Sequence, residues 1–506
     1  MGAAWHRVDW SFRVHCGMVA CMPPAIEQST PAQELASLVG SLENAPGPRY
    51  LALARRVQEL LSTGRLAAGG RLPAERELAA ALGLSRVTVA SAYRELRESG
   101  HATTRHGSGT VTELPGGTAL GPAWGVHSTD PRVLDLAHAA LEAAPEMTGA
   151  YREALVALPA FAAGHGYSGD GLPELRQALA DRYTARGLPT DPDQVLVTAG
   201  TGDATDVVLA ALLQPGDRVL VEHPTYPGIL GAVEQHGGRC LPVPVDAADP
   251  DALIGAAQLA ARQSSPRLAF LMPDFSNPTG ARVTAAGRRR LAATLWQQGV
   301  LTVVDEVSSE LYLDEGPLPP FAAGLPDAAT VTVGGLSKSV WGGLRIGWVR
   351  ADAALVAQLG EVLRRRQLSV GVVDQLAAVT LVRDLDAVLQ GRRATLRERR
   401  DLLRAELARQ LPTWTVPRPA GGLSLWCTLP PGLSSAALVA AAAPLGLLLA
   451  EGRAFGTGHA FDDHLRLPFT RPADQLYRAV ELLVQAEEAV RGGADRRTGA
   501  RALSVV

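Results

Sequence analysis

The stretch GGLSKSVWGGLRIGW, residues 334–348, contains the only lysine of the chain, Lys338. The chain has 48 basic residues, so the other 47 are arginines. A general preference for arginine explains every position that needs only positive charge. A lysine amine, unlike a guanidinium, can lose its proton and condense with an aldehyde. We therefore expect Lys338 to serve imine chemistry that an arginine could not perform.

The region around this motif has the pattern of an α/β fold. Between about residues 133 and 491, helical segments alternate with short apolar runs at 195–198, 219–222, 268–272 and 301–304. This alternation predicts a mostly parallel central sheet with helices on both faces. The most apolar stretch, residues 436–450, is shorter than the roughly 20 residues that span a bilayer, so it predicts a buried helix and no membrane partner.

The N-terminal side of the chain has a different organisation. Apolar residues recur with helical spacing from Tyr50 to a stop at Gly64, and a second helix is expected over residues 74–82. Gly83 and Leu84 then turn the chain, and Ser85 is placed to cap a third helix. Two alternating runs, 101–105 and 110–111, flank turn residues and predict a hairpin. Helix, turn, helix and hairpin in this order are typical of a winged DNA-binding unit.

The charge of this N-terminal unit supports contact with DNA. Residues 48–113 contain ten arginines and six glutamates, a local balance of +4, whereas the whole chain carries −3. An isolated arginine-rich helix is most often a solvated surface. Here the order of the predicted elements favours a basic surface that neutralises phosphates.

The run RLPAERELAAALGLSRVTVASAYRELRESG, residues 71–100, followed by RHGSGT at 105–110, resembles the winged helix-turn-helix of the GntR family of bacterial regulators. The resemblance implies that Ser85, Arg86 and Thr88 face bases in the major groove of double-stranded operator DNA. It also implies that Arg76 and Arg105 meet phosphates or the minor groove. An arginine near a helix N-terminus can form a bidentate pair with guanine.

The region after about residue 132 resembles fold-type I aminotransferases, whose cofactor is pyridoxal 5'-phosphate. A GntR-type reader joined to such a domain is similar to the MocR subgroup of regulators. Residues 1–45 lack convincing periodicity apart from a short helical candidate around residues 33–42, so we expect a mostly disordered extension there, before a DNA-binding domain over 46–114. The Gly- and Pro-containing stretch that follows predicts a linker over 115–131. An aminotransferase-like domain over 132–491 and a tail over 492–506 would follow.

The family resemblance assigns cofactor roles to motifs in the first half of this domain. In VTAGTGDAT, residues 197–205, the amides of Thr201 and Gly202 and the Thr201 hydroxyl would hold the phosphate at a helix N-terminus. In EHPTYPG, Tyr226 would stack on the pyridine ring, although a core aromatic is equally compatible. In PDFSNPTG, Asn277 would bond the phenolic oxygen. In VVDEVSSEL, Asp305 would pair with the ring nitrogen, or alternatively cap the next helix.

The remaining roles fall on later motifs and on one earlier segment. Lys338 would form the imine, with Ser337 and Arg345 completing the phosphate site. Arg466 in HLRLPF would bind a ligand carboxylate through two parallel hydrogen bonds, an arrangement that suits a planar guanidinium. Tyr167 in GYSGDGLPELR resembles the residue that reaches across a dimer to the neighbour's phosphate.

One departure from the family pattern concerns catalysis. Aminotransferases place a tyrosine two or three residues beyond the ring-nitrogen aspartate, but this chain has Val307 and Ser308 there. Losing that hydroxyl should alter the imine pKa and leave weak or vestigial transamination. We therefore expect a regulator that senses an amino compound through the Lys338 aldimine. The alternative is an active aminotransferase with a secondary DNA-binding unit, and a DNA-binding module with a dead cofactor site is disfavoured by the intact cofactor motifs.

The setting and the partners follow from simpler features. Four scattered cysteines without a CxxC pair fit a reducing cytoplasm. A homodimer is expected because such readers bind paired half-sites. The cluster His459, Asp462, Asp463 and His464 is interpreted as a polar loop beside Arg466, so no metal is predicted.

Overall fold

The computed structural model describes residues 31–42, 48–62, 66, 71–99, 101–105, 109–112, 130, 132–457 and 460–502. The chain divides into two compact units, residues 1–116 and 117–506, each described by itself. The expected linker, except Asp130 at its end, lies outside the described residues, as do the wing turn at 106–108 and most of the N-terminal extension.

The first unit contains the elements expected of a winged helix-turn-helix. Its elements are α1 (Ala32–Val39), α2 (Arg49–Ser62), α3 (Glu75–Leu82), α4 (Arg86–Glu98), β1 (Ala102–Arg105) and β2 (Gly109–Thr112). Gly83 adopts a left-handed conformation between α3 and α4. The Ser85 hydroxyl accepts from the Thr88 amide at 3.1 Å and so caps α4. Strands β1 and β2 pair antiparallel, which confirms the hairpin.

The N-terminal boundary of this unit differs from the expected one. We expected a disordered extension up to residue 45, but α1 packs into the core of the unit through Leu35 and Val39, which are both buried. The Arg56 Nε also donates to the Val39 carbonyl at 3.1 Å. A helix of eight residues is not stable alone in water. It forms here because its apolar face is covered by the rest of the unit.

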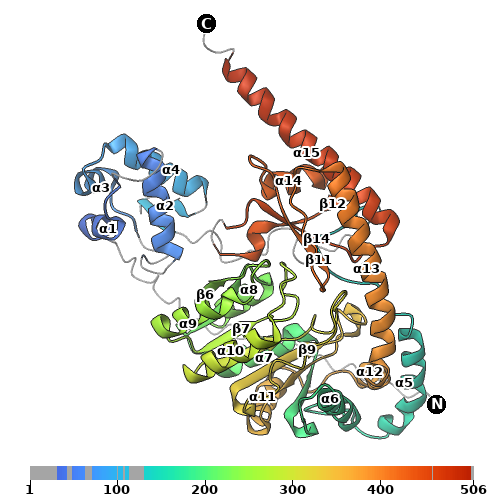
Figure 1. Cartoon of the computed structure of the whole chain (residues 1–506). Coiled ribbons are helices and arrows are strands. Elements are labelled where there is room, and N and C mark those ends of the chain that lie inside the picture. The colour runs from blue at the N-terminus through green and yellow to red at the C-terminus, as the bar shows by residue number, and fades with distance from the viewer. Residues whose placement is uncertain are drawn as a thin grey trace, which may run out of the picture. The chain divides into compact units, whose positions relative to one another are not determined.

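The second unit is built on a seven-stranded sheet, which lies in the lower part of Figure 1. The strand β10 runs antiparallel to its neighbours β4 and β9, and every other pairing is parallel. The mostly parallel sheet is therefore confirmed. In spatial order the strands are β4 (Val195–Thr198), β10 (Gly347–Arg350), β9 (Thr330–Gly335), β8 (Leu301–Asp305), β7 (Leu268–Leu271), β5 (Arg218–His223) and β6 (Arg239–Pro244).

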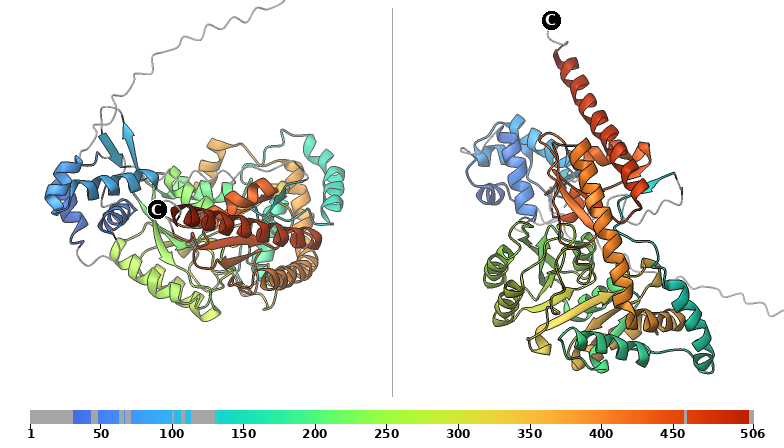
Figure 2. Two further views of the ribbon diagram at one scale, coloured as in Figure 1. Left: turned by 90° about the horizontal axis from the view of Figure 1, so that it is seen from above. Right: turned by 45° about the vertical axis from the view of Figure 1, so that its right-hand side comes forward.

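Helices cover both faces of this sheet, as Figures 1 and 2 show. In β5, Val219 and Val221 enter one buried cluster with residues of α7 and α8, whereas Leu220 enters another with residues of α9 and α10. This alternation is the period of a strand buried on both faces. The helices are α5 (Met147–Ala162), α6 (Pro173–Ala185), α7 (Thr201–Leu212), α8 (Pro227–Gln235), α9 (Ala252–Ser264), α10 (Ala285–Gln297), α11 (Ala353–Arg366), α12 (Val372–Arg383) and α13 (Leu385–Gln410).

The last part of the chain forms a smaller layer. Strands β11 (Ser424–Thr428), β14 (His464–Pro468) and β13 (Ala450–Glu451) form an antiparallel sheet, and β3 (Leu134–Asp135) pairs with β12 (Leu447–Leu448). Two helices, α14 (Ser435–Ala442) and α15 (Ala473–Ala502), pack in this region. The predicted helix over 436–450 is wrong beyond Ala442, because Pro444 has no N–H to continue the ladder. Helix α15 runs past residue 491, so the expected tail continues a helix up to Ala502.

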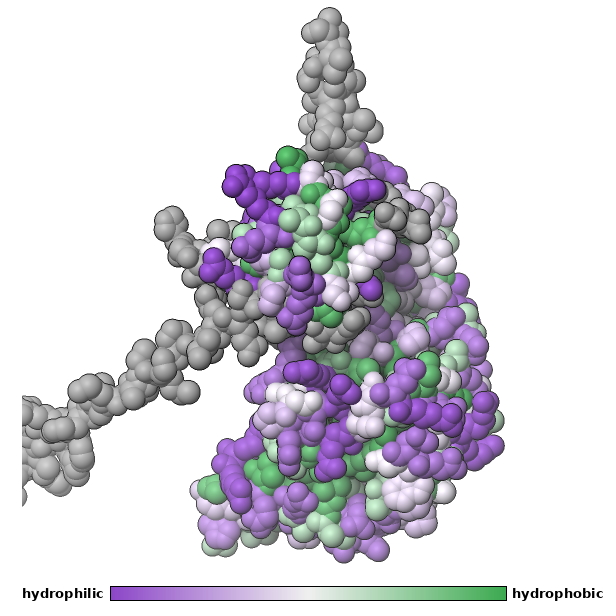
Figure 3. Space-filling view, turned by 90° about the vertical axis from the view of Figure 1, so that its left-hand side faces the viewer, coloured by the Kyte–Doolittle hydropathy of each residue, from purple (hydrophilic) through white to green (hydrophobic). Residues whose placement is uncertain are grey.

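Within the part of the chain that the structure describes, no helix is long and apolar enough to cross a membrane. On the face drawn in Figure 3, hydrophilic side chains are interspersed with smaller apolar areas.

Candidate functional site

The candidate site lies at the carboxyl ends of three strands. Strand β8 ends at Asp305, β9 leads through Ser337 to Lys338, and β4 leads into the N-terminus of α7 at Thr201. Because β10 is antiparallel to both β4 and β9, these strands share one direction. Ligands of open α/β sheets bind at this edge. The topology therefore brings together residues that are far apart in the chain.

Lys338 is held with its amine inside the site. Its Nζ donates to the backbone carbonyl of Ala139 at 2.8 Å. Burial and, to a smaller extent, the positive charge of Arg466 lower the pKa of Lys338 to about 8, while Asp305 partly opposes both. About a tenth of the amine is therefore neutral at pH 7, far more than for a lysine with an ordinary pKa. A neutral amine is the form that attacks an aldehyde.

Asp305 and Tyr226 share this environment. The Asp305 carboxylate accepts from the Val307 amide at 2.9 Å, and burial raises the pKa of Asp305 to about 6. Burial also raises the pKa of Tyr226; the charge of Asp305 adds to this rise, whereas Arg466 and Arg345 oppose it. Such mutual influence indicates that the side chains lie close together.

The N-terminus of α7 forms the anion-binding end of the site. Arg345 adopts a left-handed conformation with φ of 53°, and its Nη2 donates to the Ala199 carbonyl at 2.6 Å. Gly200 has a φ of 100°, which side chains rarely adopt, and a Cβ atom there would lie 3.0 Å from the Arg345 guanidinium, so glycine suits this close approach. The Thr201 hydroxyl lies in the same corner and donates to the Gly334 carbonyl at 3.2 Å. Gly202 is the second residue of α7, with open space beside it.

Arg466 lies on β14 and faces the same site. Its Nη1 donates to Oδ1 of Asn277 at 3.3 Å, and its Nη2 donates to the Ala137 carbonyl. The guanidinium lies 4.8 Å from the centroid of the Phe455 ring. Burial lowers the pKa of Arg466 to about 10. A buried, oriented guanidinium of this kind is suited to a carboxylate.

The residues of this site fit pyridoxal phosphate. A helix N-terminus with Thr201 and Arg345 suits a phosphate, and a buried carboxylate, Asp305, suits a protonated ring nitrogen. The amine of Lys338, with its lowered pKa, suits the aldehyde.

Several predicted residues lie apart from this cluster. Tyr167 is 60% exposed, and its ring lies beside His165. In the first unit, Arg76, Ser85 and Arg86 are exposed, and Thr88 is half-buried. Arg86 Nε donates to Glu75 at 3.3 Å. The Arg105 side chain lies outside the described residues.

The polar loop considered for a metal is partly described. Asp462 pairs with Arg453 at 2.7 Å. The His464 ring stacks on Trp426, and its Nδ1 forms a hydrogen bond with Asp463 at 2.7 Å. His459 lies outside the described residues.

Sequence reasoning missed Glu222, at the end of β5. This buried carboxylate accepts from the Met272 amide at 2.8 Å and from the Ser276 hydroxyl at 2.5 Å. It therefore fixes the segment that leads to Asn277. Burial raises the pKa of Glu222 to about 7. The available signal was a glutamate that ends an otherwise apolar run.

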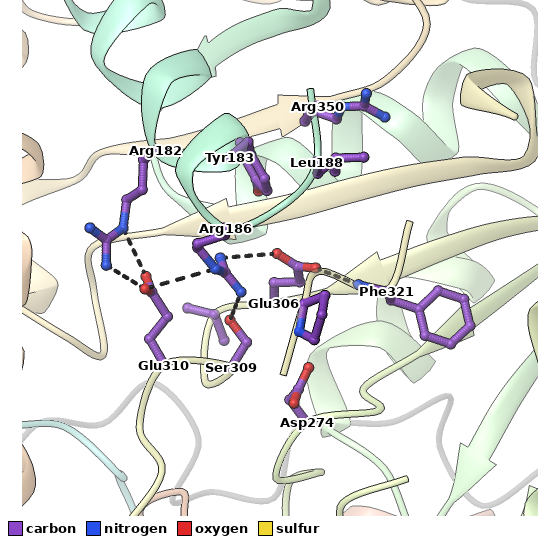
Figure 4. Close-up of polar contacts among 12 residues, drawn as sticks. Arg182, Tyr183, Arg186, Leu188, Asp274, Glu306, Ser309, Glu310, Phe321 and Arg350 are labelled. Carbon is purple, nitrogen blue, oxygen red and sulfur yellow. Dashed lines mark hydrogen bonds and ion pairs between the residues drawn. The ribbon is translucent and has the colours of Figure 1, made fainter. Parts of the chain in front are cut away.

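A second missed feature is the ionic network next to Asp305, drawn in Figure 4. Glu306 is buried, lies 3.6 Å from Arg186, and accepts from the Phe321 amide. Arg186 also lies near Glu310, which pairs with Arg182. Buried charges persist when they are paired and hydrogen-bonded. This network anchors the chain that follows Asp305.

The fold and the site together define a pyridoxal phosphate-binding protein with an aminotransferase-like domain and a winged helix-turn-helix. Residues 135–483 match the family model "Aminotransferase class I and II", and residues 49–111 match "Bacterial regulatory proteins, gntR family". The chain belongs to these families and, by their combination, to the MocR subgroup of GntR regulators.

Individual relatives agree with this assignment. The chain is 30% identical to the uncharacterized HTH-type transcriptional regulator YdcR of Escherichia coli, over 83% of this chain and 94% of that protein. It is 29% identical to the HTH-type pyridoxine biosynthesis transcriptional regulator PdxR of Corynebacterium glutamicum, over 75% and 84%.

Among solved structures, it resembles LysN, an alpha-aminoadipate aminotransferase from Thermus thermophilus complexed with N-(5'-phosphopyridoxyl)-L-leucine. The TM-score is 0.65 at 27% identity, covering 72% of this chain and 94% of that one. The protein is therefore a DNA-binding, pyridoxal phosphate-binding regulator rather than a plain aminotransferase.

Proposed function

We propose that this regulator senses a small compound carrying both an amine and a carboxylate, and that binding of this effector changes its affinity for operator DNA. The observation that carries the proposal is the placement of Lys338, Asp305 and Arg466 in one buried site. The site offers an amine-exchanging group at one end and a carboxylate receptor at the other.

Each side chain has one task in this proposal. When bound, pyridoxal phosphate supplies an aldehyde carbon that exchanges amines reversibly. Asp305 would hold the proton of the ring nitrogen, and Lys338 would hold the aldehyde carbon until an effector amine takes its place. The other cofactor ligands would be Thr201, Gly202, Ser337 and Arg345 at the phosphate, Asn277 at the phenolic oxygen and Tyr226 at the ring face.

The effector carboxylate would bind Arg466. A carboxylate is a stronger acceptor than the neutral oxygens of Asn277 and Ala137 that Arg466 contacts. An amine without a carboxylate would use only half of the site. We therefore expect weaker responses to simple amines.

The DNA-binding unit would read paired half-sites as part of a homodimer. Ser85, Arg86 and Thr88 stand at the start of α4, where a recognition helix meets base edges. Arg76 and Arg105 would contact phosphates, and Tyr167 would reach the phosphate of the second protomer. Proteins with this aminotransferase fold are generally dimeric. We place this DNA-reading function in the cytoplasm.

The competing function is transamination, because several relatives carry transaminase names. Val307 and Ser308 stand where an aminotransferase has its tuning tyrosine, which favours sensing. The test incubates purified full-length protein and pyridoxal phosphate with a panel of amino acids and amines. We expect a spectral change and altered DNA affinity without release of keto acid. Sustained keto-acid release without any DNA response would overturn the proposal.

A further inference from the structure

One irregular segment contacts both ends of the ligand site. We call residues 135–142, DLAHAALE, the strap. After Asp135 it contains no helix or strand, so its carbonyls are free to accept bonds from side chains. These side chains are all cationic: Arg471 bonds the Asp135 carbonyl at 3.0 Å, Arg466 that of Ala137, Lys338 that of Ala139 at 2.8 Å, and Arg392 that of Glu142.

The two ends of the strap are attached to different layers of the second unit. Upstream, β3 pairs with β12, and the Leu136 amide donates to Leu448 at 2.9 Å. Downstream, Arg392 on α13 also donates to the carbonyls of Ser339 and Val340, directly after Lys338. The strap therefore bridges strand β12 of the smaller C-terminal layer and the loop that carries Lys338.

Asp135 holds the first turn of the strap in shape. One carboxylate oxygen accepts from the amides of Ala137 and His138 at 2.9 and 3.2 Å. The other oxygen bonds His138 Nδ1 at 2.8 Å. This turn presents the Ala137 carbonyl to Arg466. Asp135 is therefore a positioning residue that acts through the Ala137 carbonyl.

The strap competes with a ligand for the same donors. A carboxylate that binds both terminal nitrogens of Arg466 competes with the Ala137 carbonyl, and an ionised acceptor is the stronger one. When the Lys338 amine condenses with the aldehyde, its Nζ has fewer N–H groups to donate to the Ala139 carbonyl. Condensation with the cofactor therefore weakens the Lys338 contact, and an effector carboxylate weakens the Arg466 contact. Because the effector amine would set Lys338 free again, the contact between Arg466 and Ala137 is the one that effector binding releases.

We propose that the strap transmits effector binding to the DNA-binding unit. Its upstream end continues through residues 132–134, so along the sequence the strap is the ligand-contacting segment of the second unit that lies nearest to the DNA-binding unit. This inference rests on the proposed function, because it names the route by which the same site regulates DNA binding. A ligand shifts such an equilibrium only through its different affinity for the two arrangements.

The first experiment measures amide hydrogen exchange in the full-length protein. One sample contains pyridoxamine 5'-phosphate, which has no carboxylate, and the other contains N-(5'-phosphopyridoxyl)-L-leucine. We expect the amides of the strap to exchange about tenfold faster with the leucine adduct, while those of β8 stay unchanged. Equal or slower exchange with bound adduct would overturn the strap inference alone. If the adduct does not bind, the proposed function fails instead.

The second experiment separates ligand binding from transmission. Asp135→Asn keeps the size of the side chain but weakens the turn, and Asp181→Asn, at an exposed aspartate on α6, is the matched control. Binding of the adduct should stay within about threefold of wild type in both variants. DNA selected from a random pool by the wild-type protein reports the response.

We expect the adduct to change the DNA affinity of wild type and Asp181→Asn by about tenfold, and that of Asp135→Asn by less than about twofold. His138→Ala, which removes one bond to Asp135, should give an intermediate response and covers the case in which Asp135→Asn does not fold. A full response in His138→Ala and in folded Asp135→Asn would overturn the proposal.

Discussion

The Nη1 group of Arg466 donates to Oδ1 of Asn277 at 3.3 Å, although 189 residues separate the two along the chain. The bond joins β14 to the loop that follows β7. One partner is proposed to bind the effector carboxylate and the other the phenolic oxygen of the cofactor. A carboxylate at Arg466 therefore competes for a group beside the cofactor, which couples the two ligands.

Arg466→Gln should weaken binding of the leucine adduct by about 10- to 100-fold, because a hydrogen bond to a charged group contributes about 1.5–3 kcal/mol. Binding of pyridoxamine 5'-phosphate should change little. Fluorescence or absorbance titration of both compounds measures the difference. The control is Arg409→Gln, an exposed arginine on α13 that pairs with Glu406. Equal losses for both compounds would show that Arg466 is not the carboxylate receptor.

Lys338→Ala should abolish the absorption band that marks condensation of the cofactor with the protein. In the wild type, condensation needs the neutral amine, and the pKa of Lys338 is about 8. The rate of reconstitution should therefore rise about tenfold per pH unit below pH 8 and level off above it. Stopped-flow absorbance with apoprotein measures this profile.

The same profile tests the coupling to Arg466. Removing its positive charge in Arg466→Gln should raise the pKa of Lys338 and move the plateau to higher pH. An unchanged profile would mean that the charge of Arg466 does not affect the pKa of Lys338. Lys338→Arg is the matched control that keeps the charge but cannot condense.

Arg86→Ala should weaken operator binding by about 10- to 100-fold, since a bidentate arginine–guanine pair contributes about 1–3 kcal/mol of discrimination. The cofactor spectrum should stay unchanged. The side chain is exposed at the start of α4 and bonds only weakly to Glu75 in the described structure, so folding should be retained. Gel-shift titration with selected DNA gives the affinity. Unaltered binding would place the recognition surface elsewhere.

The site residues that directly follow short buried strands were predictable from the sequence. Asp305 and Lys338 each come just after an apolar run, and Thr201 opens a helix three residues after another. Strand ends in a parallel sheet meet at one edge, so these motifs were expected to converge. The capped turn at Ser85 was predictable for a similar reason, because capping depends on neighbouring residues.

The strap and its partners were not predictable in this way. Its acceptors are backbone carbonyls, which every residue has, and Arg392 is one of 47 arginines. The pairing of Ala137 with Arg466 spans 329 residues and leaves no local pattern. The placement of α1 was missed because its stability comes from tertiary packing rather than from its own sequence.

Glu222→Gln should make stability less dependent on pH. Burial raises the pKa of Glu222 from 4.5 to about 7, so the folded protein binds more protons than the unfolded chain between these values. Wild-type stability should therefore fall as the pH rises from about 4.5 to 7, by an amount on the order of 2–3 kcal/mol. Glutamine does not ionise, and it can still accept from Met272 and donate to Ser276.

Denaturant unfolding of the cofactor-free protein at pH 5 and pH 8 measures this effect. The variant should gain stability over wild type at pH 8 and little at pH 5. Glu406→Gln, which changes a surface carboxylate bonded to Arg409, should show no such gain. A constant difference between wild type and Glu222→Gln at both values would mean that the carboxylate ionises normally. In that case the Met272 amide and the Ser276 hydroxyl would donate to an ionised Glu222 carboxylate at both pH values.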